Sequence, residues 1–189
     1  MKSNRDEKAK TNTTNTYMVA INAGNALSYE EHVEVLEKFT LGPNSTLEAE
    51  LPGLAARFIE LIKQEFLREG YLEERIYCVG ETGNITALFI PDMDQDNKVV
   101  WVNCYFKETS ILGSIHCMEA WTYHSKGEND PVQKKINAGE IRISELPEQD
   151  RTELLRITAR SHNGFIKSWS IPIQRVGEQL SLGPTIADD

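Results

Sequence analysis

The chain has 189 residues, of which 40% are hydrophobic and 26% charged, so it is large enough to bury a core without disulfides. Its net charge of -9 argues against general nucleic-acid binding, because such binding depends on phosphate neutralisation by Lys and Arg. No apolar signal region opens the chain, and no run approaches the ~20 apolar residues of a membrane span. We therefore expect a cytoplasmic protein that does not enter membranes.

Residues 1–16 are predicted to form a disordered polar tail, and residues 17–186 a single domain. Residues 29–39 are predicted to form a short helix, because Ser28 and Glu31 have the spacing of a capping box. A longer helix follows, with one apolar stripe and with Gly70 at its left-handed C-cap. The stripe contains Leu54, Phe58, Leu61, Ile62 and Phe66.

Residues 74–91 read as a β-hairpin whose turn contains Gly. Three further strands are expected at 114–125, 152–161 and 164–175, and residues 179–183 could add a short edge strand. Pro172 lacks a backbone N-H and therefore predicts an edge strand or a bulge. Cys78, Cys104 and Cys117 lie in apolar stretches without metal-site or redox spacing, so we expect them to be reduced core residues.

Residues 92–97, DMDQDN, resemble a calcium loop at three aspartates, but Asn97 and Asn103 stand where an EF-hand needs Gly and Glu. The aspartates instead favour a turn or the start of a helix. The residues that follow, 98–108, fit both a helical stripe and a strand face. The segment 125–150 is long for a connection, and predicts either a short helix at 132–136 or a mobile flap.

Glu119 is the strongest candidate functional residue. In a strand it shares a face with Cys117 and Trp121, and a carboxylate on an apolar face must be paired or neutralised. Arginines of the next strand are its expected partners, in a structural ion pair or in an acid-base site. These are Arg151, Arg156 and Arg160.

A metal site at His116, Glu119 and His124 is not expected. In a strand His116 and Glu119 point to opposite faces, and the two histidines stand about 26 Å apart at ~3.3 Å per residue. The chain also lacks a P-loop, GxGxxG, GxSxG and HExxH, so we expect no cofactor and no standard nucleophile site.

A basic surface is expected near the C-terminus. Residues 151–175 hold five basic side chains and one acidic, whereas residues 1–150 hold 15 basic and 25 acidic. Arg156, Thr158 and Arg160, with Lys167, Ser168 and Ser170 on the next strand, could either bind an anionic partner or form an ordinary solvated face.

Short motifs in the second half resemble a group of small proteins found in bacterial genomes and mobile elements. The resemblance lies in a Glu-Ala-Trp strand, a Pro-x-x-Asp-Arg-x-Glu turn and a final Leu-Gly, and it extends loosely from residue 55 to residue 184. It implies a long helix, a hairpin, a second helix and a three-strand meander, but no activity. The matching residues are Glu119, Ala120, Trp121, Pro147, Asp150, Arg151, Glu153, Leu182 and Gly183.

The expected fold is α+β, with an antiparallel sheet of four to six strands and two or three helices packed on one face. Two classes of function remain open. The first is a non-catalytic interaction or regulatory protein that meets another protein through residues 125–150 or the C-terminal sheet face, for example an acidic inhibitor carried by a mobile element. The second is a hydrolase or transferase acting on a phosphorylated or nucleotide ligand, with Glu119 as general base and Arg151, Arg156 or Arg160 holding the anion. The candidate catalytic residues are Glu119, Arg151 and Glu153.

Overall fold

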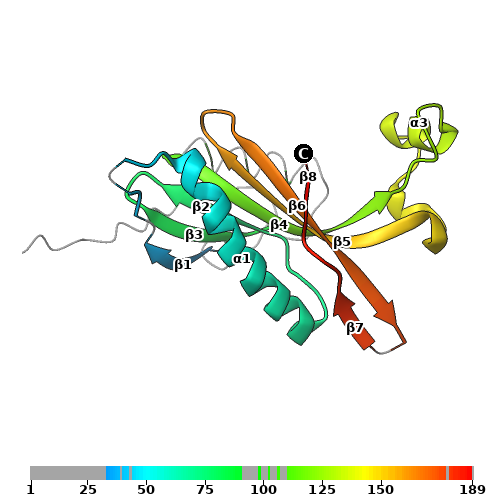
Figure 1. The fold of residues 1–189 in the computed structure, drawn as a ribbon, viewed down its shortest axis with the longest axis horizontal. Coiled ribbons are helices and arrows are strands. Elements are labelled where there is room, and N and C mark those ends of the chain that lie inside the picture. Colours follow the sequence, from blue (N-terminus) through cyan, green and yellow to red (C-terminus); the bar gives the residue numbers. More distant parts are fainter. Residues whose placement is uncertain are drawn as a thin grey trace, which may run out of the picture.

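The computed structural model describes residues 33–38, 40–42, 44–90, 98, 102, 106, 110–177 and 179–188. The fold is α+β, as predicted: one long helix packs on a curled antiparallel sheet (Figure 1). The strand order is β1-β3-β2-β4-β5-β6-β7, and β8 also pairs with β6. The strands are β1 (Val33–Lys38), β2 (Arg75–Gly80), β3 (Asn84–Phe89), β4 (Ile111–Tyr123), β5 (Arg151–Ser161), β6 (Ile166–Val176), β7 (Gln179–Leu182) and β8 (Ile186–Asp188).

The predicted helix at 29–39 is wrong within the described residues, because Val33–Lys38 is strand β1, paired antiparallel with β3. The capping-box spacing before it was misleading, and the alternation of Val33 and Val35 with Glu34 fits a strand better. Together with the short β8, β1 raises the sheet to eight strands, above the four to six expected. The hairpin and the three-strand meander are confirmed as β2-β3 and β4-β5-β6.

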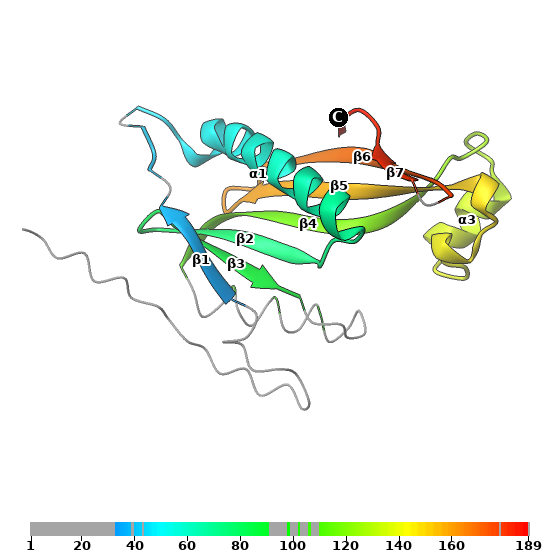
Figure 2. The same ribbon diagram turned by 90° about the horizontal axis from the view of Figure 1, so that it is seen from below.

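Helix α1 (Leu47–Glu69) has Thr46 as its N-cap, whose hydroxyl accepts from the Ala49 N-H, and Gly70 as its C-cap. Gly70 has φ of 81°, and its N-H donates to the Phe66 carbonyl at 2.8 Å, so the predicted left-handed C-cap is confirmed. The helix crosses one face of the sheet over β4 and β5 (Figure 2). We call this the helical face and the opposite side the distal face.

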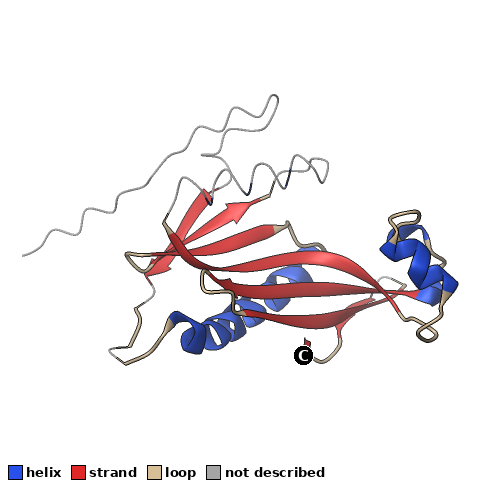
Figure 3. Ribbon diagram, turned by 90° about the horizontal axis from the view of Figure 1, so that it is seen from above, coloured by secondary structure: helices blue, strands red, loops and turns tan. Residues whose placement is uncertain are grey.

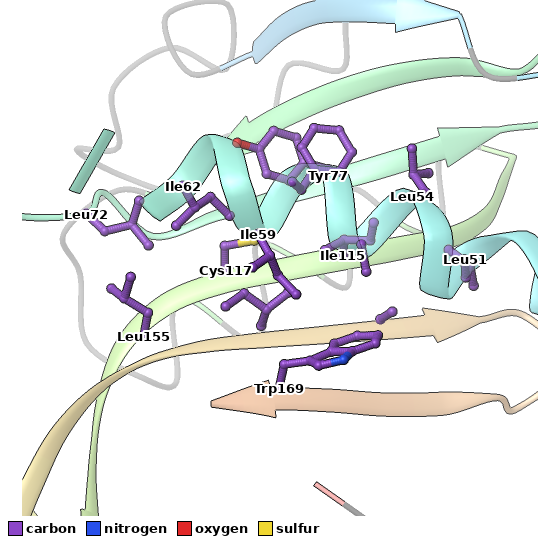
Figure 4. Close-up of a cluster of buried hydrophobic side chains, with 14 of the residues drawn as sticks. Leu51, Leu54, Ile59, Ile62, Leu72, Tyr77, Ile115, Cys117, Leu155 and Trp169 are labelled. Carbon is purple, nitrogen blue, oxygen red and sulfur yellow. The ribbon is translucent and has the colours of Figure 1, made fainter. Parts of the chain in front are cut away.

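The main core lies between α1 and the helical face (Figure 4). Ile62 and Phe66 of the helix are fully buried, as are Ile115 of β4 and Leu155 of β5. The helix comes close to the sheet at Gly113, where a Cβ atom would lie 2.9 Å from the Leu47 side chain. Leu61, predicted in the apolar stripe, is instead 48% exposed.

A second, smaller cluster lies on the distal face, formed by Ile76, Cys78, Leu88 and Ile90. Val102 and Phe106 pack against it, and both are helical, as is Lys98. Of the two structures that residues 98–108 could form, the helix is therefore the one present at these three positions, and it lies on the face opposite α1. The DMDQDN stretch and Cys104 lie outside the described residues, whereas Cys78 and Cys117 are buried reduced cysteines, as expected.

The β4-β5 hairpin continues past the sheet into residues 124–150, which we call the arm. The arm contains helix α3 (Pro131–Asn137) and two 3₁₀ turns, Ile143–Glu145 and Glu148–Asp150. The expected short helix at 132–136 is therefore present. Figures 1 and 3 show these turns beyond the ends of β4 and β5, away from α1.

At Pro172 the partner of β6 changes from β7 to β8. Ile173 pairs with Leu182, and Ser170 pairs with Ile186, so two residues of β6 face three residues of the partner segment. Regular pairing on this side of β6 is therefore interrupted at Pro172, which has no backbone N-H to donate. The Gly183 N-H donates to the Pro172 carbonyl at 2.8 Å within this interruption.

Candidate functional site

Glu119 lies on the helical face of β4, just past the end of α1. Its Oε1 accepts a hydrogen bond from the Leu72 N-H at 2.5 Å, and Leu72 is buried. The carboxylate therefore holds the chain that leaves α1 against β4. This backbone contact was not expected, because the two partners stand 47 positions apart in the sequence.

Glu153 and Arg175 complete a cluster around Glu119. Arg175 Nε lies 3.0 Å from Glu153 Oε2, and its Nη2 lies 3.3 Å from Glu153 Oε1, a bidentate ion pair. Both Nη atoms of Arg175 also donate to the Gly70 carbonyl at 3.3 Å, and its Cζ lies 5.5 Å from the Phe66 ring centroid. The guanidinium thus caps the C-terminal end of α1, where positive charge is favourable.

The electrostatics of the cluster raise the pKa of Glu119 above its usual value. Burial is the largest cause, and the negative charge of Glu153 adds to it, while the Leu72 N-H and Arg175 act in the opposite direction. The pKa of Arg175 is also raised, chiefly by its hydrogen bond to Glu153. A carboxyl group with a raised pKa beside a second carboxylate is an arrangement used in acid-base catalysis.

In this chain, however, the cluster is closed by structural contacts. Glu119 accepts a backbone N-H, and both oxygens of Glu153 face Arg175. Arg175 in turn holds the end of α1. The cluster therefore fixes the C-terminal end of α1 to β4, β5 and β6.

Arg151 is not part of this cluster, although the sequence suggested it as a partner of Glu119. Its Cζ lies 4.2 Å from the Trp121 ring centroid, and its Nη1 donates to the Ser144 carbonyl in the arm. In the β4-β5 register Arg151 pairs with Tyr123, four residues beyond Glu119. Arg151 and Trp121 therefore connect the arm to the sheet.

Arg156 and Arg160 also fail as partners of Glu119, because strand alternation places them on the distal face with Thr158. Arg156 Nη1 lies 2.8 Å from Asp188 Oδ2 and 3.3 Å from Ser170 Oγ. Ser168 and Ser170 share that face, and Thr158 Oγ1 lies 3.0 Å from Ser168 Oγ.

The predicted binding set must be corrected at Lys167, which pairs with Ala159 and therefore lies on the helical face. Its Nζ lies 5.8 Å from the Trp169 ring centroid. Adjacent residues of a strand point to opposite sides, so Lys167 cannot share a face with Ser168. The distal basic row is thus Arg156 and Arg160 without the lysine.

His116 and Glu119 lie on opposite faces, as strand alternation predicted. His116 Nε2 is 2.9 Å from Glu74 Oε1, and Lys98 Nζ is 2.7 Å from Glu74 Oε2. These contacts lower the pKa of Glu74 to about 2, with the His116 hydrogen bond as the largest cause. Within the described residues, no group of three or more His, Cys, Asp or Glu side chains is placed to hold a metal ion.

Asp130 organises the arm and was missed by the sequence analysis. Its Oδ2 accepts from the Tyr123 hydroxyl at 2.6 Å and from the Lys126 N-H at 2.7 Å. Its Oδ1 accepts from the Val132 N-H at 2.9 Å, at the start of α3. Hydrogen bonds to the carboxylate lower the pKa of Asp130 to about 2, with the Lys126 N-H as the largest cause, and the shared bond raises the pKa of Tyr123 to about 12. The Asp-Pro pair at 130–131 is a recognisable N-cap signal that could have identified it.

A cavity of about 200 Å³ lies between α1 and the β2-β3 hairpin. Its charged groups are paired: Arg75 is 5% exposed and makes two bonds to Glu65, at 3.0 and 2.5 Å. The Arg75 guanidinium also stacks 4.8 Å from the Phe89 ring centroid. The lining residues are Leu61, Gln64, Glu65, Arg68, Arg75, Tyr77, Ala87 and Phe89.

None of the helices in the described part of the chain combines the length and the apolar character that crossing a membrane requires. Comparisons with protein-family models, with curated proteins and with solved structures find no match.

Proposed function

We propose that this chain is a non-catalytic cytoplasmic interaction or regulatory protein, and that the arm is its principal contact surface. The observation that carries the proposal is the arm's position: two long strands carry residues 124–150 past the end of the sheet, away from α1 (Figure 1). Such a projection contributes little to the main core, whose members all lie in the body of the domain.

The packing of the arm supports a role in recognition. No residue of α3 is buried, and the apolar side chains Val132, Ile136, Ile143 and Leu146 are only partly covered. A segment that held structure alone would bury these groups, whereas a contact surface leaves them for a partner. The Tyr123 and Asp130 bonds nevertheless give the arm a defined shape, which lowers the entropic cost of binding.

Charge favours a basic partner. A chain with net charge of -9 is attracted to positively charged protein surfaces and repelled by nucleic acid. In the form that this charge suggests, the partner is a host or defence protein that binds nucleic acid, and it is inhibited by carboxylates standing where phosphates normally bind.

The role of the arm can be tested by deleting it, because it leaves the sheet between two paired residues. Tyr123 and Arg151 are paired neighbours, so residues 124–150 can be replaced by an Asn-Gly turn that closes a two-residue hairpin. Partners captured by the unaltered chain would be identified, purified and tested for direct binding to both chains at low and high salt. Leu61→Ala, an exposed change on α1, serves as the control.

We expect the hairpin-closed chain to fold and to lose the partner, the Leu61→Ala chain to keep it, and salt to weaken the complex. If the hairpin-closed chain binds the partner as tightly as the unaltered chain does, the arm is not the contact surface. Failure to find any directly binding protein would overturn the interaction function itself.

A further inference from the structure

Strand β8 is held to the rest of the domain by few contacts. It pairs with β6 at three positions only, Ser168↔Asp188, Trp169↔Ala187 and Ser170↔Ile186. Ile186 is 50% exposed and Ala187 is also exposed, so β8 buries little apolar surface. Its attachment therefore depends on backbone pairing and on one side chain.

That side chain is Asp188, which reaches the distal basic row. Its Oδ2 lies 2.8 Å from Arg156 Nη1, and Ser170 Oγ donates to Oδ1 and Oδ2 at 3.3 and 3.1 Å. Ser170 is 9% exposed, so its hydroxyl is placed at the base of the contact rather than in open solvent. The β6 edge, Arg156 and Ser170 therefore bind an extended backbone that carries a carboxylate at one fixed position.

The described part of β8 does not cover the whole edge of β6. The strand begins at Ile166, and within the described residues β8 pairs only from Ser168 onward. Ile166 is 62% exposed on the distal face, beside Arg160 in the β5-β6 register. A longer strand could pair there and cover this apolar side chain.

We propose that the β6 edge at Ser168–Ser170, together with Arg156, is a docking site for an extended acidic segment of another protein, which β8 occupies in the unbound chain. The partner adds a strand to the sheet and places an Asp or Glu carboxylate on Arg156. β8 is thus both an example of the ligand chemistry and an internal competitor. This site is separate from the arm and does not depend on the arm's function.

The competition has a definite physical consequence. A tethered segment is present at an effective concentration in the millimolar range, so a free peptide of similar strength meets a largely occupied edge. Apparent affinity falls in proportion to the fraction of chains whose edge is open. Freeing the edge should therefore raise the affinity for an added peptide by about tenfold or more.

The experiment uses the full chain and a fluorescein-labelled peptide with the sequence of residues 183–189, GPTIADD. The edge is freed by changing Ile186, Ala187 and Asp188 together to Gly. Fluorescence anisotropy then measures peptide binding to the unaltered chain and to this open-edge chain. We expect binding to the open-edge chain and binding at least about tenfold weaker to the unaltered chain.

A double-mutant cycle tests the carboxylate contact. In the open-edge chain Arg156→Gln should weaken binding about three- to tenfold, and a peptide with Asn in place of Asp188 should bind with a similar loss. The two changes together should cost no more than either alone, because they remove the same contact. Arg160→Gln, on the same strand and face, is the matched control and should change affinity by less than about twofold.

Equal affinity of the two chains, absence of binding to the open-edge chain, or additive losses in the cycle would each overturn the proposal. The peptide change leaves the protein intact, so a folding defect cannot explain its effect. If light scattering shows that the unaltered chain is a dimer that the peptide dissociates, the edge belongs to a second copy of this chain instead.

Discussion

Replacing Glu119 by Gln or by Ala separates its hydrogen bond from its charge. Glu119→Ala leaves the Leu72 N-H without its acceptor, in a residue that is 6% exposed. An unsatisfied buried donor costs about 1–3 kcal/mol, and because Glu119 itself is partly exposed we expect the lower half of that range. Glu119→Gln keeps an oxygen that can accept the same N-H, so its unfolding free energy should stay within about 1 kcal/mol of the unaltered chain.

The pH dependence of this comparison has a defined sign. The pKa of Glu119 is raised in the folded chain, so its protonated form favours folding and its ionised form opposes it. That stabilisation is complete below the unfolded pKa of about 4.3 and is lost as the pH rises through the folded pKa. The Gln variant carries no such proton. The stability of the unaltered chain minus that of Glu119→Gln should therefore be greater at pH 4 than at pH 7.

Urea unfolding followed by circular dichroism at both pH values measures these quantities. With a slope of about 2 kcal/mol per molar urea, a loss of about 1–2 kcal/mol should lower the unfolding midpoint of the Glu119→Ala chain by about 0.5–1 M. Identical midpoints for the Ala and Gln variants would show that the Leu72 contact does not stabilise the fold. A stability difference that grows with pH would refute the electrostatic argument.

Three further outcomes are expected. In thermal unfolding, Gly70→Ala should lower stability by about 1 kcal/mol because its φ is 81°, whereas Gly53→Ala, whose added Cβ meets nothing within 4 Å, should raise it by about 0.5–1 kcal/mol. Stability changes of the same sign in the two variants would contradict the placement of the α1 C-cap at Gly70. Leu155→Ala should cost about 2–5 kcal/mol in urea unfolding because the side chain is fully buried, and a loss below 1 kcal/mol would place it outside the core. Asp130→Asn should speed proteolysis within the arm. In the unaltered chain, the near-ultraviolet circular dichroism signal of Tyr123 should persist through pH 4 and fall as the pH approaches 2, because the pKa of Asp130 is about 2. Loss of that signal near pH 4 would exclude Asp130 as the group responsible.

The elements that the sequence predicts well are those whose evidence is local. The stripe and Gly70 identify α1, and the alternation of Leu155 and Ile157 with Arg156 identifies β5. Strand β1 was missed because its six residues are stabilised by pairing with β3, and a short segment takes its structure from such neighbours.

The candidate site was predicted only in part. Glu119 and Glu153 could be placed on one face by alternation, but Arg175 comes from β6 and the Leu72 N-H from the chain after α1. The β5-β6 turn does fix the register that pairs Arg160 with Ile166, so counting along the two strands would have brought Arg175 near Glu153. The position of the helix terminus above them depends on packing, which alternation does not describe.

The burial of strand β2 determines which part of the molecule unfolds last. Arg75 to Val79 are buried on both faces, under α1 on one side and under the second cluster on the other. Its amides should be the last to exchange with deuterated solvent, whereas those of α3, which buries no residue, should exchange early. We therefore expect the arm to open and close locally many times while the rest of the domain stays folded.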